Sequence, residues 1–328
     1  AINPAPPEPP CTPFAARGAE RTLLITKLLM VYRYLGLFGL ITAVYFAVVT
    51  AVARAIGVKT MKRRVFNYRL YLDTSDRGLS RTLFLFGKRE IDHYKMLQGI
   101  LEPGMQILDI GANIGYYALM ESLVIGPNGQ VTAIEPMLPN IEMLKRNIEL
   151  NSATNIDVVH GAVSASTGTG QMYMSSHSNL HTFHRDGTAS AYLESTPVDV
   201  PTMTLRDAAV RAGNRVDLIR MDVEGHEVEI LGQLVDLVGE GVIAPRVIFE
   251  THFSRYTPEN DFAPVLNGLF SLGYSVRTAA SSGESGTTRL RALGYAGSEP
   301  FYSDFGTRSI FSDIAKEHAV DLICHTGG

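Results

Sequence analysis

Acidic residues and one histidine follow apolar segments that we expect to be strands in the second half of the chain. Asp222 and Glu224 come after the apolar run VDLIRM, and Glu250 and His252 come after the run RVIF. An imidazole, with an unperturbed pKa of about 6.5, can take a proton near neutral pH, and carboxylates can orient it or bind hydroxyl groups. We therefore take these four residues as the candidates for acid–base catalysis, with His252 as the preferred base.

Other interpretations of the same residues stay open. Carboxylates beside one imidazole also permit a divalent cation site, although we assign no metal ion from the sequence. The segment from Asp222 to Gly225 also fits the start of a helix, where acidic residues favour the helix dipole. His252 equally fits an ordinary loop histidine.

A glycine-bearing turn follows another apolar segment nearer the middle of the chain. Residues 106–117 read QILDIGANIGYY, which predicts a strand, a turn and the start of a helix. Glycine lets the backbone approach a ligand closely, and a helix N-terminus presents unpaired N–H groups to it. The turn therefore supplies candidate cofactor-binding residues: Asp109, Gly111, Ala112, Asn113 and Gly115.

The next two predicted strands end in residues that suit a nucleoside. Glu135 closes the run QVTAIE, at about the spacing of 20 residues at which such folds place the acid that holds ribose hydroxyls. Gly161 and Ala162 are small enough for an adenine ring to lie against the backbone. The turn lacks both the lysine of phosphate-binding loops and the dinucleotide spacing of glycines, so nucleotide triphosphate hydrolysis is disfavoured and an NAD-binding dehydrogenase is the weaker interpretation.

The pattern of elements predicts the architecture and four parts of the chain. Apolar runs of strand length alternate with amphipathic helical segments, which predicts a doubly wound, mainly parallel α/β (Rossmann-like) sheet with both faces covered. We expect a proline-rich tail at 1–21, a hydrophobic transmembrane helix at 22–58, a lead-in strand and helix at 59–103, and a cofactor-binding domain at 104–328.

The predicted transmembrane helix rests on residues 34–53, an apolar run without a charged side chain. A helix of about 20 such residues is long enough to cross a bilayer. Basic residues are more frequent after the run than before it, which places the large domain on the cytoplasmic side, or on the matrix or stromal side of an organelle inner membrane. A buried core or hairpin helix is the alternative, and the initial Ala1 suggests a processed or trimmed N-terminus.

Composition narrows the partners and the redox chemistry. The formal net charge of −4 gives no sign of nucleic-acid binding at the level of the whole chain, so we expect no nucleic-acid partner. Cys11 and Cys324 lie near opposite ends and are expected to be free thiols.

Two polar stretches interrupt the alternation. Residues 171–196 and 281–288 are rich in Ser, Thr or Gly and are expected to be loops that form lids or substrate walls. The first stretch contains histidines at helical spacing. The surrounding residues are poor helix formers, so we expect a solvated loop and not a metal site: His177, His181 and His184.

The order and spacing of several blocks in residues 68–312 resemble the FkbM-type S-adenosylmethionine-dependent methyltransferases. The resemblance implies a class I methyltransferase sheet with one antiparallel strand, at RSIFSD near the end of the chain. Where the family usually has Lys ahead of the acidic block, this chain keeps the positive charge with Arg220. The blocks are FGKREIDHYKMLQGILEPG, ILDIGANIGYYAL, VTAIEP, LKRNIELN, VDLIRMDVEGHEVEIL and VIFETH.

The resemblance also implies a cofactor and an activity. S-adenosylmethionine would have its methionine part surrounded by Asp109, Gly111, Asn113 and Gly115, with its ribose held by Glu135. We expect a membrane-anchored O-methyltransferase acting on a hydroxyl of a sugar, glycolipid or similar small acceptor. The alternative is an accessory or assembly subunit of a larger membrane complex that keeps the fold with little or no catalysis.

Overall fold

The computed structural model describes residues 13–175, 182–183, 193–303 and 306–326. Cys324 forms no disulfide with any residue of these ranges. Four residues for which we made predictions lie outside the described residues: Cys11, His177, His181 and His184.

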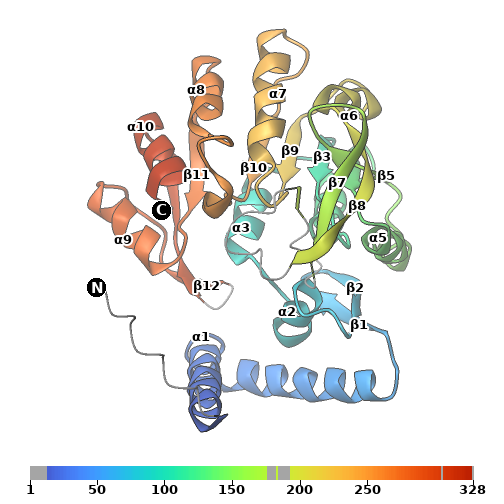
Figure 1. Cartoon of the computed structure of the whole chain (residues 1–328), viewed down its shortest axis with the longest axis vertical. Coiled ribbons are helices and arrows are strands. Elements are labelled where there is room, and N and C mark those ends of the chain that lie inside the picture. Colours follow the sequence, from blue (N-terminus) through green and yellow to red (C-terminus); the bar gives the residue numbers. More distant parts are fainter. Residues whose placement is uncertain (1–12, 176–181, 184–192, 304–305, 327–328) are drawn as a thin grey trace, which may run out of the picture.

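A long N-terminal helix, α1 (Pro13–Ala55), precedes the domain. It starts within the stretch that we expected to be a tail, so the prediction of a tail for residues 13–21 is wrong. Gly36 has non-helical angles (φ 69°, ψ −176°) and divides α1 into two segments that point in different directions (Figure 1). The second segment, Leu35–Ala55, has a mean hydropathy of 2.2 and is only 6% buried, so by length and composition it is a candidate membrane span.

The lead-in packs between α1 and the main domain. It contains a hairpin and two helices: β1 (Thr60–Val65), β2 (Tyr68–Asp73), α2 (Leu79–Phe86) and α3 (Ile91–Ile100). The guanidinium of Arg63 lies 3.7 Å from the centre of the Phe46 ring, which joins β1 to the second segment of α1. On its other side the hairpin is tied to the domain, because the Tyr68 hydroxyl donates to the Tyr116 carbonyl at 2.5 Å.

The domain is built on a five-stranded parallel sheet, as the alternation of elements predicts. Its spatial order is β10 (Arg246–Phe249), β9 (Leu218–Met221), β3 (Gln106–Ile110), β4 (Gln130–Glu135) and β5 (Ile156–His160). The chain enters at the central strand β3, continues through β4 to β5, and then crosses to β9 and β10. The strand order therefore reverses between β3 and β9, and the carboxyl edge there is where such sheets bind ligands.

Helices cover both faces of this sheet. In β3, Leu108 and Ile110 belong to one buried apolar cluster and Ile107 belongs to the other, as expected for a strand covered on both sides. The lead-in, α4 and α5 pack on one face, and α6, α7 and α8 pack on the opposite face. These helices are α4 (Tyr116–Ile125), α5 (Leu138–Leu150), α6 (Leu205–Arg211), α7 (Glu227–Gly239) and α8 (Ala263–Ser271).

The polar stretch at 171–196 is not simply a loop, which corrects our expectation. Its described ends belong to a second, three-stranded sheet of β6 (Ala162–Val163), β7 (Gly168–Ser175) and β8 (Leu193–Met203). The reason is an apolar side chain at alternate positions: Met172 and Val200 are buried and Val198 packs against them.

The resemblance implies one antiparallel strand in the main sheet, at RSIFSD. An antiparallel strand does lie there, but it belongs to a separate two-stranded sheet. β11 (Val276–Ala280) pairs with β14 (Ile310–Ile314) in an antiparallel manner. The expected loop at 281–288 is partly wrong, because α9 begins at Glu284 and the Thr287 hydroxyl is bonded inside that turn. The remaining elements are η2 (Phe253–Arg255), α9 (Glu284–Ala292), β12 (Phe301–Ser303), β13 (Gly306–Arg308), α10 (Lys316–Val320) and η3 (Asp321–Thr326).

Candidate functional site

A pocket of about 830 Å³, part of it open to solvent, lies at the carboxyl edge of the parallel sheet. Residues after β3, β4, β5 and β9 line it, together with side chains of α4 and the second sheet. Of the predicted catalytic residues, Asp222 and Glu224 line the pocket. Most of the predicted cofactor residues also do: Gly111, Ala112, Asn113, Glu135, Gly161 and Ala162.

The turn after β3 needs a glycine because β9 passes very close to it. Gly111 has φ 79°, and a Cβ there would lie 2.3 Å from the backbone oxygen of Asp222. The N–H groups of Gly111 and Ala112 both donate to the Ile134 carbonyl, at 2.9 and 3.1 Å. The N–H groups of these two residues are therefore already paired, and what the residues offer a ligand is close approach to the backbone.

Glu135 ends β4 at the pocket with its carboxylate almost fully surrounded. It accepts hydrogen bonds from the N–H groups of Asn113 (2.8 Å) and Met137 (3.0 Å) and from the Asn140 side chain (3.1 Å). Burial raises the pKa of Glu135 to about 7, against the opposing effect of these hydrogen bonds. Oε1 already accepts two of these hydrogen bonds, whereas Oε2 accepts one, so Oε2 has a lone pair that can accept from a ligand hydroxyl.

Two predicted cofactor residues do not line the pocket. Asp109 is completely buried beneath it, with Oδ1 3.2 Å from Nη1 of Arg220. Gly115 faces α5, where a Cβ would lie 2.6 Å from Cδ1 of Leu144. In this structure both residues hold the turn in place and do not form the surface of the pocket.

Arg220 lines the pocket and joins the ends of β3 and β9. Its Nη1 donates to Asp109 and to the Gly111 carbonyl (3.3 Å), its Nη2 lies 3.7 Å from Asp222, and its guanidinium lies 4.2 Å from the centre of the Tyr117 ring. Burial alone would lower the pKa of Arg220, but Asp109 and Asp222 raise it by more, so the side chain stays charged. The charge at this position is thus a structural link between two neighbouring strands.

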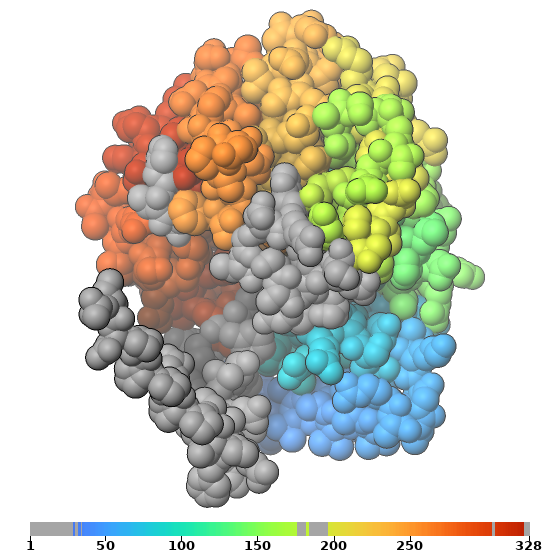
Figure 2. All heavy atoms as spheres, viewed as in Figure 1, coloured from blue at the N-terminus to red at the C-terminus, as the bar shows by residue number. Residues whose placement is uncertain are grey.

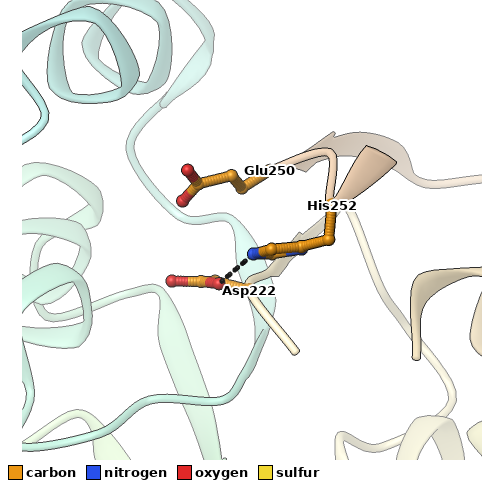
Figure 3. Close-up of side chains that lie close together, drawn as sticks. All are labelled: Asp222, Glu250 and His252. Carbon is orange, nitrogen blue, oxygen red and sulfur yellow. Dashed lines mark ion pairs between the residues drawn. The ribbon is translucent and has the colours of Figure 1, made fainter. Parts of the chain in front are cut away.

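The predicted acidic residues and the histidine meet beside the pocket, as shown in Figure 3. Asp222 from the end of β9 and Glu250 and His252 from the end of β10 each bring one ligand atom to within 4.8 Å of the others. Nε2 of His252 lies 3.7 Å from Asp222 and 3.6 Å from Glu224, and its Nδ1 lies 2.8 Å from Oε1 of Glu227. The imidazole is therefore flanked by carboxylates at both nitrogens.

This crowding changes the protonation that we assumed for the site. Burial alone would lower the pKa of His252, but Glu227 and Glu224 raise it well above the ordinary value. Burial and the neighbouring Asp222 raise the pKa of Glu250 to about 8, and burial raises that of Asp222 to about 6. The ordinary histidine pKa behind the choice of His252 as base does not apply, and these groups share protons as a cluster.

Glu227 was missed by sequence reasoning, although it holds the imidazole in place. It is fully buried at the first position of α7, and it accepts from the Tyr256 hydroxyl at 3.4 Å. The same hydroxyl accepts from the N–H of His252 at 3.0 Å. A third acid in the run DVEGHE was the available signal, but its direction depends on the packing of β10 against β9.

A short piece of the polar stretch covers the pocket. The Thr182 hydroxyl donates to the Glu224 carbonyl at 2.9 Å, and the Phe183 ring lies 4.7 Å from the His226 ring. Phe183 and His226 both line the pocket, as do Tyr116 and Tyr117 of α4. Sequence reasoning missed these aromatic side chains, because only the fold turns them toward the site.

A doubly wound sheet with a close glycine turn and a strand-end glutamate in one pocket is the arrangement of a class I methyltransferase. Residues 109–276 match the methyltransferase FkbM domain, which covers half of the chain. The chain therefore belongs to the FkbM family of methyltransferases, and S-adenosylmethionine is its cofactor.

Other methyltransferases are similar to this chain over short segments only. A protein-L-isoaspartate O-methyltransferase of Methanothrix thermoacetophila is 33% identical over 61 residues, 19% of this chain and 29% of the relative. A probable cobalt-precorrin-6B C(15)-methyltransferase (decarboxylating) of Sulfolobus acidocaldarius is 28% identical over 74 residues, 23% and 38% of the two chains. The chain thus spans well under half of these curated relatives.

Solved structures show distant likeness. Fibrillarin of Aeropyrum pernix with natively bound S-adenosyl-L-methionine is 13% identical, with 78% of this chain and 88% of that chain covered and a TM-score of 0.36. A likeness of this size carries no argument about the site, so the fold assignment depends on the strand order described above.

Proposed function

We propose that this protein is a membrane-anchored O-methyltransferase that transfers the methyl group of S-adenosylmethionine to a hydroxyl of a sugar, glycolipid or similar small molecule. The observation that carries the proposal is the position of Asp222. It lines the cofactor pocket and also belongs to the cluster with Glu250 and His252. A hydroxyl held by this cluster would therefore lie at the edge of the cofactor pocket.

The proposed reaction assigns separate tasks to the two groups of residues. Glu135 accepts hydrogen bonds from the ribose hydroxyls, and Gly111 lets the cofactor approach the backbone. Bound S-adenosylmethionine would supply the methyl group: an oxygen–carbon bond to the acceptor would form as the carbon–sulfur bond breaks, with the acceptor oxygen in line with that bond. The hydroxyl proton passes to the cluster of Asp222, Glu250 and His252, which would contribute about 10²- to 10⁴-fold to the rate.

The chemistry of the cluster favours a hydroxylated acceptor. Carboxylates accept hydrogen bonds in pairs, and adjacent hydroxyls of a sugar supply donors at that spacing. The similar methyltransferases do not decide the acceptor, because their names include methyl transfer to oxygen and to carbon. The proposal therefore rests on the acids beside the pocket.

Helix α1 supplies the proposed anchor. Apolar side chains of its second segment are exposed, among them Phe38 (82%), Tyr45 (60%) and Val48 (57%), and this segment lies beneath the domain in Figure 2. Basic residues follow at the domain side, as expected for a cytoplasmic, matrix or stromal interface: Arg54, Lys59, Lys62, Arg63 and Arg64. The anchor would hold the pocket close to lipid-borne acceptors.

Transfer of a labelled methyl group tests the proposed activity. The full chain in detergent is incubated with tritium-labelled S-adenosylmethionine and a glycolipid fraction extracted from membranes. We expect a labelled product that survives mild alkali, because a methyl ether is stable where a methyl ester is hydrolysed. Alkali-labile label would contradict a hydroxyl acceptor. Absence of label, together with stable co-purification of other membrane subunits, would favour the accessory-subunit alternative.

Flotation with phosphatidylcholine vesicles tests the anchor. We expect the wild-type chain to float and to resist extraction at alkaline pH. The double substitution Val44→Lys and Val48→Lys should abolish this, since each lysine at the centre of a span costs about 3 kcal/mol. Equal flotation of this variant would contradict a membrane-spanning helix.

A further inference from the structure

We propose that Asp222, Glu250 and His252 form a binding site for one divalent cation of the manganese and magnesium class. Its task would be to hold the acceptor hydroxyl, and that part rests on the function proposed above, whereas cation binding itself does not. Figure 3 shows the three side chains converging from the ends of β9 and β10.

The geometry suits a cation with modest adjustment. One ligand atom of each residue lies within 4.8 Å of the other two. Ligands bound at about 2.1 Å lie roughly 3 Å from one another when they are adjacent around an octahedral ion. A cation would therefore draw the side chains inward by an ångström or two, a movement that side-chain rotation at the two strand ends can supply.

The donor set narrows the kind of ion. Carboxylate oxygens suit magnesium, calcium and manganese, and an imidazole nitrogen shifts the preference toward the transition metals. Two carboxylates and one imidazole together favour manganese, which accepts both. The remaining coordination positions would be open to water or to hydroxyl oxygens of an acceptor.

A second carboxylate orients the imidazole in the way common to metal-bound histidines. Nδ1 of His252 lies 2.8 Å from Oε1 of Glu227, so Nε2 points toward Asp222. Glu227 is fully buried and also accepts from the N–H of Gly225 at 3.3 Å. A buried carboxylate behind a ligand histidine fixes its tautomer and raises its basicity, so we assign Glu227 as a positioning residue.

An unsatisfied oxygen points to a missing ligand at the same place. Oδ1 of Asp222 is buried and accepts no hydrogen bond from any residue that the structure describes. Among the residues that the structure describes, its ion-pair partner is Nε2 of His252, at 3.7 Å. Buried carboxylate oxygens are rarely left without a partner, and a cation between these atoms would satisfy both.

With this site, different residues would bind the acceptor and accept its proton. A cation between Asp222, Glu250 and His252 would bind the acceptor oxygen at the edge of the cofactor pocket. Glu224 lines the pocket next to these residues and is outside the ligand set. With a cation bound, Glu224 would therefore accept the hydroxyl proton in place of the three ligand residues, to which the function proposed above gives that task.

Titration with Mn²⁺, followed by electron paramagnetic resonance of the free ion, tests the site in the detergent-purified full chain. We expect one Mn²⁺ bound per wild-type chain. Glu250→Gln and His252→Ala should weaken binding by about 100-fold, and Glu227→Gln by about 10-fold. Glu259→Gln is the matched control, because it makes the same chemical change at an exposed glutamate near the site and should leave binding unchanged.

The outcomes separate this proposal from the proposed function. Absence of Mn²⁺ binding by the wild type, or equal binding by Glu250→Gln and His252→Ala, would overturn the cation site. Thermal melting identifies a variant that fails to fold, and Glu250→Gln, the most conservative change, then carries the test. Methyl transfer that persists after chelation would also overturn the cation site while leaving the proposed function intact. Specific Mn²⁺ binding without methyl transfer to any acceptor would support the cation site and contradict the proposed function.

Discussion

The two ends of the pocket are both built from strand ends, but their buried carboxylates have different partners. At the β4 end, N–H donors of Asn113 and Met137 surround Glu135. At the β9 and β10 end, Asp222 and Glu250 face one another beside His252. At the first end the hydrogen bonds only partly offset the burial of one carboxylate, whereas at the second end two carboxylates and an imidazole lie close enough to share protons or a cation. In the proposed function, this difference separates the residues that bind the cofactor from those that take part in the chemistry.

The largest effect is expected for a substitution at Gly111, where the turn after β3 contacts the end of β9. Gly111→Ala places a Cβ against the Asp222 carbonyl at 2.3 Å and should cost about 3 kcal/mol or more in the free energy of unfolding, with loss of cofactor binding. Gly104→Ala is the control, since Gly104 also has a positive φ (83°) but nothing within 4 Å of its Cβ position. It should cost about 1 kcal/mol. Denaturant unfolding measures both, and equal costs would contradict the role of close approach.

A second prediction concerns the chemical end alone. His252→Ala should lower the rate of methyl transfer by about 10²- to 10⁴-fold, because the cluster loses its imidazole. The replacement Glu227→Gln keeps a hydrogen-bonding group at Nδ1 and should have a smaller effect, about 10-fold. Formation of S-adenosylhomocysteine at saturating cofactor measures both. A larger loss in Glu227→Gln than in His252→Ala would contradict the assigned roles.

A third prediction concerns Glu135, at the β4 end of the pocket, and the pH dependence of cofactor affinity. The pKa of Glu135 is raised from 4.5 to about 7, so the group contributes stability that is complete below pH 4.5 and lost as pH rises through 7. Ribose hydroxyls donate to the ionised form, so cofactor affinity should rise by up to about tenfold per pH unit below 7 and level off above it. Glu135→Gln should flatten this dependence. Calorimetry from pH 5.5 to 8 measures it, and a wild-type affinity that falls over this range would contradict the sign.

The smallest expected effect concerns the cover of the pocket. Phe183→Ala removes a ring that packs against His226 and should weaken cofactor binding about threefold to tenfold. Phe253→Ala, which removes an exposed ring (42%), is the control and should leave the affinity unchanged. Stopped-flow release of the cofactor measures the change, and equal release rates in Phe183→Ala and the wild type would exclude a covering role.

Local sequence predicted the strands and their ends better than it predicted partners across the sheet. Glu135 ends strand β4 and lies at the pocket, as expected, because the end of an apolar run can be read directly from the sequence. The partner of His252 could not be predicted in this way. Glu227 lies at the start of a helix, and only the parallel pairing of β10 with β9 brings it to the imidazole.

The same limit explains the roles that changed. Asp109 and Gly115 belong to the turn motif, but burial under Arg220 and packing against Leu144 make them supports of the pocket. The N–H of Gly111 donates to the Ile134 carbonyl, because the neighbouring strand β4 extends far enough to present it. Each of these depends on the distance between elements, which a single sequence does not contain.

Calorimetry with S-adenosylmethionine on three forms of the full chain tests the central claim most directly. Glu135→Ala should weaken cofactor binding by about 10- to 100-fold, the value of a hydrogen bond to a charged group, whereas Glu142→Ala, on the exposed side of α5, should not. His252→Ala should bind the cofactor with wild-type affinity. If His252→Ala loses as much affinity as Glu135→Ala, or Glu135→Ala loses none, the two ends of the pocket do not have the separate tasks assigned to them.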